Sequence, residues 1–204
     1  MPTLPTLMES LNSEIADVVG RVRGSLVGIS NGRLGAGAGT IWDTDGLILT
    51  NAHVVGRGSP QVTLADSRRY AATLWARDEG LDLAALAIDA TGLPAMALGE
   101  SSRLQTGQLV LALGHPWGTV GAVTAGVVIG QGSAWPELPR SKREWIGVSL
   151  NLRPGNSGGP LIDVHGRLVG LNTVMTGPEA GFAVPVHVAK AFLHEALASQ
   201  GAAC

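Results

Sequence analysis

Residues 153–160 read Arg-Pro-Gly-Asn-Ser-Gly-Gly-Pro, and this stretch decides how the 204-residue chain is interpreted. Ser157 stands among three glycines, with a proline on each side. Glycines adopt left-handed and strained backbone conformations without the steric cost of a Cβ atom. A nucleophilic serine needs that freedom, because its Oγ must be exposed while nearby N–H groups converge on an oxyanion. An ordinary glycine-rich turn is the alternative interpretation of this segment, and the pattern favours the functional one.

A serine hydroxyl needs a general base to become a nucleophile. Of the five histidines, His53 lies in the segment Thr50-Asn-Ala-His-Val-Val55, just past an expected strand end, where a rigid scaffold presents polar groups. Asp82 interrupts an apolar run, and a carboxylate there needs a partner. We therefore predict that Asp82 orients His53 and that His53 activates Ser157. Taken singly, His53 and Asp82 are better explained by structural roles.

Composition excludes several classes of protein. The net charge of −2 leaves no basic footprint for nucleic acid. The single cysteine, Cys204, excludes an internal disulfide framework and a cysteine zinc site. No run of about 18 apolar residues predicts a membrane span. His194-Glu195 does not begin an HExxH zinc motif, and Gly35–Gly39 matches no phosphate-binding loop, so we expect no metal or cofactor. Gly35–Gly39 is interpreted as the flexible approach to a hairpin.

Short apolar runs separated by turn residues predict an all-β barrel or sandwich. Asp45-Gly46 between two β-prone runs is a strong hairpin signal. Helical periodicity occurs at residues 7–20, where Gly20 is expected to end the helix, and at residues 187–199. Residues 99–107 are the least structured connection and are predicted to link two halves.

Three segments, TNAHVV around His53, LDLAAL around Asp82 and PGNSGGPL around Ser157, together resemble the trypsin-like serine proteases. Their spacing, 29 and then 75 residues, and segments such as Val110–Gly118 and Gly181–Pro185 narrow the resemblance to the HtrA/Deg branch. The resemblance covers about residues 20–195. It implies an all-β fold of two six-stranded antiparallel β-barrels with N- and C-terminal helices.

The expected divisions are an N-terminal helical segment, a first barrel, a linker, a second barrel, and a C-terminal helix with its tail. Their bounds are 1–24, 25–98, 99–107, 108–186 and 187–204.

The family resemblance also implies the roles of individual residues. Ser157 would attack the scissile carbonyl, and the N–H groups of Gly155 and Ser157 would form the oxyanion hole, helped by Asn156. Leu152 and Met175 match positions that line the first specificity pocket, which predicts small or medium aliphatic P1 residues. Core packing is the alternative for both. The implied function is a serine endopeptidase that cleaves unfolded or exposed polypeptides in protein quality control.

Three departures from the family pattern limit the resemblance. We expect no PDZ domain after the second helix, and Ser149–Arg153 lacks the family's Asp-Ala stretch. The first residues show neither a signal peptide nor an anchor, which makes the cytoplasm the default location, although a processed chain would look the same. The N-terminal helix is expected either to support a homotrimer, as in that family, or to fold back on its own barrel.

Two other functions compete with the protease. Gly155–Gly159 formally fits the G-x-S-x-G elbow of α/β-hydrolases, with Asp163 and His187 as partners. That elbow needs a helix directly after the serine, which Pro160 opposes. The second competitor is a protease-like barrel that binds peptides or acts as a chaperone without cleaving them.

Overall fold

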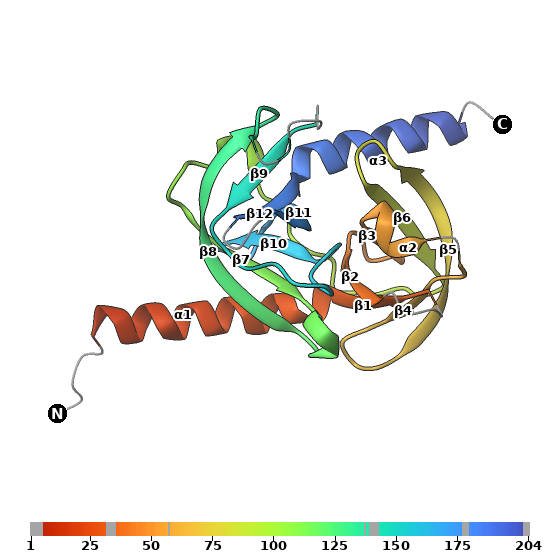
Figure 1. The fold of residues 1–204 in the computed structure, drawn as a ribbon. Helices are drawn as coiled ribbons and strands as arrows, with labels where there is room; N and C mark the ends of the chain where they lie inside the picture. Colours follow the sequence, from red (N-terminus) through yellow and green to blue (C-terminus); the bar gives the residue numbers. More distant parts are fainter. Residues whose placement is uncertain are drawn as a thin grey trace.

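The strands of this protein form two closed antiparallel barrels in the computed structural model (Figure 1), which describes residues 6–31, 36–56, 58–136, 138, 143–176 and 180–201. Barrel 1 has the strand order β1-β2-β3-β6-β5-β4, and barrel 2 has the order β10-β11-β12-β9-β8-β7. Listed from β7, barrel 2 has the order β7-β8-β9-β12-β11-β10, which is the same pattern of connections as in barrel 1. The prediction of two six-stranded barrels with terminal helices is therefore confirmed.

The bounds of the elements are as follows. Barrel 1 contains β1 (Leu26–Ser30), β2 (Ala36–Ile41), β3 (Leu47–Thr50), β4 (Gln61–Thr63), β5 (Arg69–Asp78) and β6 (Leu83–Ile88). Barrel 2 contains β7 (Leu109–Gly114), β8 (Ala122–Gly132), β9 (Trp145–Val148), β10 (Pro160–Asp163), β11 (Leu168–Thr176) and β12 (Ala180–Pro185). The helices are α1 (Leu7–Val22), α2 (Ala52–Val55) and α3 (Val186–Gly201), with short 3₁₀ turns η1 (Arg23–Ser25), η2 (Ser101–Arg103) and η3 (Pro116–Gly118).

The predicted hairpin connects β2 to β3. Asp43 Oδ1 accepts hydrogen bonds from the N–H groups of Asp45 and Leu47, at 2.9 and 3.1 Å. Gly46 has φ +96°, and a Cβ atom there would lie 2.3 Å from the Ile88 carbonyl oxygen. Gly46 is therefore needed for two reasons: the turn is left-handed, and the chain there passes close to the end of strand β6.

The prediction for the glycine-rich segment before this hairpin is wrong for its described part, because Gly37 and Gly39 belong to strand β2. A Cβ atom on Gly37 would lie 2.5 Å from a methyl group of Val54 and 3.2 Å from the Ser157 carbonyl oxygen. These glycines therefore serve close packing rather than flexibility. At Gly37 the missing side chain lets a strand of barrel 1 approach the Ser157 segment of barrel 2.

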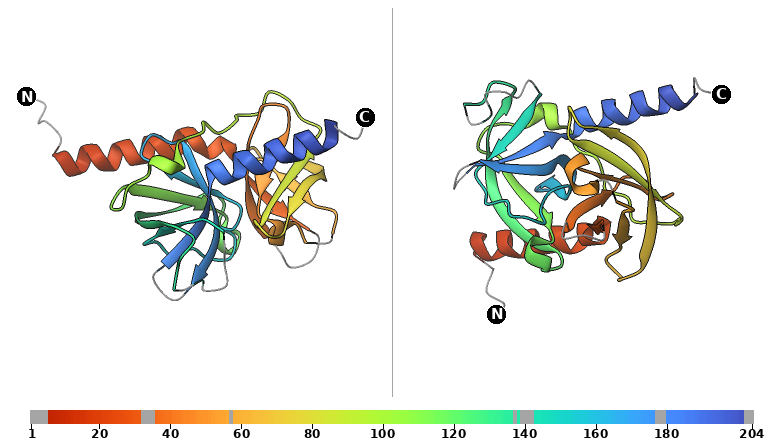
Figure 2. Two further views of the ribbon diagram at one scale, coloured as in Figure 1. Left: turned by 90° about the horizontal axis from the view of Figure 1, so that it is seen from above. Right: turned by 45° about the vertical axis from the view of Figure 1, so that its right-hand side comes forward.

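Helix α1 begins at a capping box, in which the side chains and N–H groups of Thr6 and Glu9 bond reciprocally. The helix continues past Gly20 to Val22, so the predicted end at Gly20 is wrong. Val18 and Val22 both lie against the turn at Gly166, and this contact requires the last helical turn. The helix extends beyond barrel 2 (Figures 1 and 2), and its first turns leave Leu7 and Met8 exposed at 84% and 69%.

Each barrel has its own apolar interior, and two further clusters join the barrels. In one of them Phe192 and Leu193 of α3 pack with Leu49 of barrel 1 and Phe182 of barrel 2. Helix α3 thus buries one face against both barrels, and Figure 1 shows it running over barrel 1. This packing fixes the barrels relative to each other. No helix within the described residues is long and apolar enough to cross a membrane.

Candidate functional site

His53 and Asp82 meet at one end of barrel 1. His53 lies on the single-turn helix α2, directly after strand β3, and Asp82 directly precedes strand β6. His53 Nδ1 lies 2.9 Å and 3.0 Å from the two carboxylate oxygens of Asp82, and the His53 N–H also donates to Asp82 Oδ1 at 3.1 Å. The His53 side chain is 51% exposed and that of Asp82 is 14% exposed. The carboxylate therefore holds the imidazole from the protein side and leaves the rest of the ring facing solvent.

The backbone of Asp82 is itself held in place. Its carbonyl oxygen accepts hydrogen bonds from Asn51 Nδ2 at 2.9 Å and from the Ala52 N–H at 3.2 Å. Asp82 has φ +54°, a left-handed conformation that only glycine, asparagine and aspartate adopt readily. The segments around His53 and Asp82, 29 residues apart in the sequence, are thus joined by both main-chain and side-chain bonds.

Ser157 lies in the loop that precedes strand β10 of barrel 2. Its carbonyl oxygen accepts a hydrogen bond from the Ala38 N–H of strand β2 at 2.8 Å. Its Oγ donates to the Thr173 carbonyl oxygen at 3.0 Å. Among the described residues, no hydrogen bond joins Ser157 Oγ to His53. The hydroxyl is therefore turned toward strand β11 in this structure.

A path of hydrogen bonds connects the two halves of the site. Asn51 Nδ2, which bonds the Asp82 carbonyl, also donates to Thr173 Oγ1 at 2.9 Å, and the Thr173 carbonyl accepts from Ser157. Asn51 is fully buried and Thr173 is 8% exposed. Sequence reasoning missed both residues. The available signal was a polar residue inside an otherwise apolar segment, since such a group needs a partner when it is buried.

Residues 153–157 form a loop that carries the two N–H groups predicted to form the oxyanion hole. Within the described residues, neither the Gly155 N–H nor the Ser157 N–H donates a hydrogen bond. Gly155 has φ +103°, and a Cβ atom there would lie 2.3 Å from the His115 carbonyl oxygen. A side chain would therefore displace the loop. Unpaired N–H groups next to a serine are the donors that an oxyanion requires.

The turn between β7 and β8, residues 115–121, supports this loop. The His115 N–H donates to the Gly155 carbonyl at 2.9 Å, and the Trp117 N–H donates to the Pro154 carbonyl at 3.3 Å. The Arg153 guanidinium lies 4.8 Å from the centre of the Trp117 ring. Trp117 has φ +51° although it is neither glycine nor asparagine, and it is 72% exposed.

Asn156, Leu152 and Met175 were also predicted to belong to the site. Asn156 is 3% exposed, its N–H donates to the Arg153 carbonyl, and its Oδ1 accepts from the Arg153 N–H at 2.9 Å. It therefore shapes the loop. Leu152 is 4% exposed and packs with the inner residues of barrel 2, while the side chain of Met175 lies outside the described part of the chain. Their roles toward a substrate stay predictions.

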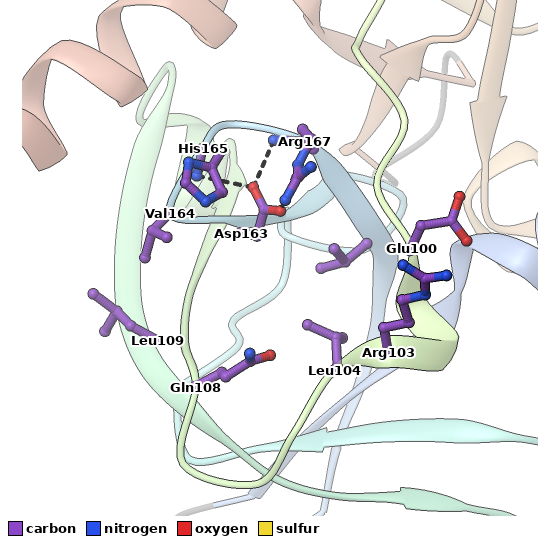
Figure 3. A pocket seen from close by; sticks show the side chains of 10 residues that line it. Glu100, Arg103, Leu104, Gln108, Leu109, Asp163, Val164, His165 and Arg167 are labelled. Atoms are coloured by element: carbon purple, nitrogen blue, oxygen red, sulfur yellow. Dashed lines mark hydrogen bonds and ion pairs between the residues drawn. The ribbon is translucent and has the colours of Figure 1, made fainter.

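A separate hollow of about 320 Å³ lies at the mouth of barrel 2 (Figure 3). Neither His53, Asp82 nor Ser157 lines it. Asp163 at its rim accepts hydrogen bonds from Arg167, and His187 bonds Ser101 and Glu144, each at 2.8 Å. Asp163 and His187, which the α/β-hydrolase hypothesis requires as partners of Ser157, therefore form hydrogen bonds to other residues. That hypothesis is wrong. Within the described ranges no group of three or more His, Cys, Asp or Glu residues is placed to hold a metal ion.

Comparison with known proteins shows which family this chain belongs to. Residues 37–171 match the family model of the trypsin-like peptidase domain. The chain belongs to the trypsin-like peptidases. Within that family it is 40% identical over 174 residues to the putative serine protease HhoA of Synechocystis, and 40% identical over 165 residues to the mitochondrial serine protease HTRA2 of Drosophila pseudoobscura. These alignments cover 82% and 78% of the chain, which therefore belongs to the HtrA proteases.

Solved structures agree with this assignment. The HtrA-type protease AlgW with a tripeptide superposes with a TM-score of 0.82 at 33% identity, covering 88% of this chain and 62% of AlgW. The same protease with a decapeptide gives 0.81 at 29% identity, covering 90% of this chain and 67% of that one. The chain spans only 44% of the HhoA length and 39% of the HTRA2 length.

Proposed function

We propose that this chain is a serine endopeptidase domain in which Ser157, His53 and Asp82 form the catalytic triad. The observation that carries the proposal is the two-oxygen contact between Asp82 and His53 Nδ1, which Asn51 and Thr173 connect by hydrogen bonds to Ser157. Within the described residues, the N–H groups of Ser157 and Gly155 donate no hydrogen bond. Asp82 fixes the tautomer in which Nδ1 carries the proton. His53 Nε2 is then unprotonated and available as a base on the exposed side of the ring.

In the proposed reaction, the Ser157 hydroxyl rotates from the Thr173 carbonyl to His53 Nε2 and transfers its proton as Oγ attacks the scissile carbonyl. The carbonyl oxygen becomes an oxyanion, and the Gly155 and Ser157 N–H groups donate to it. His53 next protonates the leaving amine, which departs and leaves an acyl-enzyme on Ser157. Water, deprotonated by His53, hydrolyses the ester and restores the hydroxyl.

The proposed substrates are unfolded or exposed polypeptide segments, consistent with a role in protein quality control. Leu152 and Met175 would line the pocket for a small or medium aliphatic P1 side chain. The peptide-bearing AlgW structures support a peptide substrate. No metal or organic cofactor takes part in the proposed steps.

Two measurements on one set of variants test the proposal. Wild type, Ser157→Ala and the exposed control Ser102→Ala are incubated with reduced casein, and the fragments are read by mass spectrometry. We expect fragments from wild type and Ser102→Ala only, with cuts after aliphatic residues. Labelling with a fluorophosphonate should add one adduct to Ser157 in the same two proteins.

Each other outcome has a defined meaning. Fragments from Ser157→Ala would overturn the triad assignment. Peptide binding by wild type without cleavage or labelling would identify a non-enzymatic peptide-binding barrel, for which the hydrogen bond from Ser157 to Thr173 is the supporting observation. A loss of several degrees in melting temperature for Ser157→Ala would make Ser157 a packing residue instead.

We further propose a homotrimer assembled through α1. Leu7, Met8 and Leu11, in the first turns of α1, are 84%, 69% and 41% exposed. A folded-back helix would bury these side chains against its own barrel. Sedimentation should show that Leu7→Glu/Leu11→Glu is a monomer, whereas Leu197→Glu, on an exposed position of α3, stays trimeric. A monomeric wild type would contradict this proposal.

A further inference from the structure

A cavity of about 410 Å³ lies where the end of α1 meets both barrels. Its walls come from η1 and β1, from the turn between β4 and β5, and from the β7–β8 turn. Its apolar lining includes Leu26, Leu64 and Val120. Neither His53, Asp82 nor Ser157 lines it, so it is separate from the proposed catalytic site. Cavities of this size with a mainly apolar lining are typical of small-molecule sites.

Arg23 is the cationic side chain among the described residues that line this cavity. Its Nη2 donates to the Val120 carbonyl at 3.1 Å, and its guanidinium lies against Gly121. No described carboxylate forms an ion pair with it, and no Asp or Glu is among the described residues that line the cavity. The nearby Asp66 is instead paired with Arg68, whose Nε lies 2.7 Å from its carboxylate. The cavity thus carries one positive charge that no described acidic group compensates.

His115 contributes a ring to the wall without adding a second charge. Its Nδ1 accepts a hydrogen bond from the Gly121 N–H at 3.2 Å, which the neutral tautomer protonated at Nε2 permits. Burial lowers the pKa of His115, the Val27 carbonyl opposes that shift, and the positive charge of Arg23 adds to it. The wall at this position is therefore a neutral ring at neutral pH.

We infer that this cavity binds a small organic carboxylate of about six carbons, with an apolar tail. The tail would occupy the apolar walls, and the carboxylate would pair with the Arg23 guanidinium, whose remaining N–H groups are suited to a carboxylate. The site adjoins the proposed oxyanion loop, because His115 lines the cavity with its ring and holds the Gly155 carbonyl with its N–H. Binding is independent of the proposed peptidase activity.

The test is an NMR titration of the full chain with hexanoate, using 1-hexanol and hexylammonium as probes of the same length. We expect saturable shifts of amides in segments 23–28, 63–67 and 115–121 with hexanoate. Arg23→Gln should weaken hexanoate binding at least about tenfold, as expected for the loss of a charge-assisted hydrogen bond. Arg21→Gln, which removes a charge from the same helix end outside the cavity, should bind like wild type.

A second variant tests whether hexanoate binds in this cavity, and it leaves the charge of Arg23 in place. A Cβ atom at Gly28 would lie 3.8 Å from Thr63 and 3.9 Å from the His115 ring, so Gly28→Val should fold and fill the cavity. We expect it to abolish hexanoate shifts while keeping the melting temperature near that of wild type.

Four results would overturn the inference. They are equal affinity for hexanol, unchanged binding in Arg23→Gln, unchanged binding in folded Gly28→Val, and shifts confined to other segments. None of these results depends on proteolysis, so a failed protease proposal would leave this test intact.

Discussion

The two barrels share a strand order, yet they hold their parts of the candidate site in different ways. In barrel 1, His53 and Asp82 are fixed to each other by side-chain and main-chain hydrogen bonds. In barrel 2, Ser157 lies in an irregular loop that depends on a neighbouring turn and on left-handed glycines. The proposed base is therefore preorganised by direct contacts, whereas the proposed nucleophile and N–H donors are positioned indirectly.

This difference predicts that variants in the two barrels lose activity in different ways. Changes in barrel 1 should remove the chemistry and leave the loop intact. Changes around Ser157 should act through loop geometry, with smaller and graded losses. The path through Asn51 and Thr173 is the described side-chain connection between the two halves.

The largest effect is expected for Asp82→Asn. Asparagine tolerates the left-handed backbone at this position, so the fold should persist, while the amide favours the wrong His53 tautomer. We expect kcat on a fluorogenic peptide to fall about 10⁴-fold with little change in melting temperature. Asp89→Asn, an exposed control after β6, should keep wild-type activity. Less than a tenfold loss in Asp82→Asn would remove Asp82 from the proposed triad.

Gly155→Ala should come next. Its new Cβ would meet the His115 carbonyl at 2.3 Å in a backbone with φ +103°, so the loop must move and its N–H groups lose their alignment. We expect kcat to fall about 10²–10³-fold, the effect typical of a lost oxyanion donor. Gly92→Ala is the matched control, because Gly92 has φ +68° with nothing within 4 Å. Equal activity losses in both variants would point to general strain instead.

Arg153→Gln tests the support that the β7–β8 turn gives to this loop. The lost contact with the Trp117 ring is worth about 0.5–1 kcal/mol, so kcat/KM should fall about two- to fivefold. Arg68→Gln removes a similar ring contact with Tyr70 in barrel 1 and should not change kcat/KM. A double-mutant cycle with Trp117→Ala separates the pair from the single residues. Additive losses would show that the contact does not support the loop.

The smallest effect concerns His115 and pH. Because burial lowers its pKa in the folded protein, the unfolded chain binds more protons between the folded value and about 6.5. The free energy of unfolding should therefore fall as the pH drops below about 6.5. Urea denaturation at several pH values should show a weaker decline for His115→Gln than for wild type or the exposed control His165→Gln. Parallel profiles would mean that His115 titrates normally.

Local sequence determined the features that depend on near neighbours. Asp45-Gly46 specified its hairpin because a left-handed turn is a local property, and short apolar runs specified strands. Gly20 misled the same reasoning, since the packing of Val22 on the Gly166 turn carries the helix further. Gly37 and Gly39 misled it too, because their function is a close approach that only the folded chain creates.

For the candidate site, the sequence by itself determined the residue types and their order, because Ser157, His53 and Asp82 each stand in a locally unusual segment. Only the tertiary structure decided that Asp82 holds His53, that Asn51 and Thr173 connect the barrels, and that Ser157 rests on Thr173. These contacts join residues 16 to 122 positions apart in the chain. The number of residues between two positions does not determine their distance in space, because that distance depends on how the two barrels close and pack together.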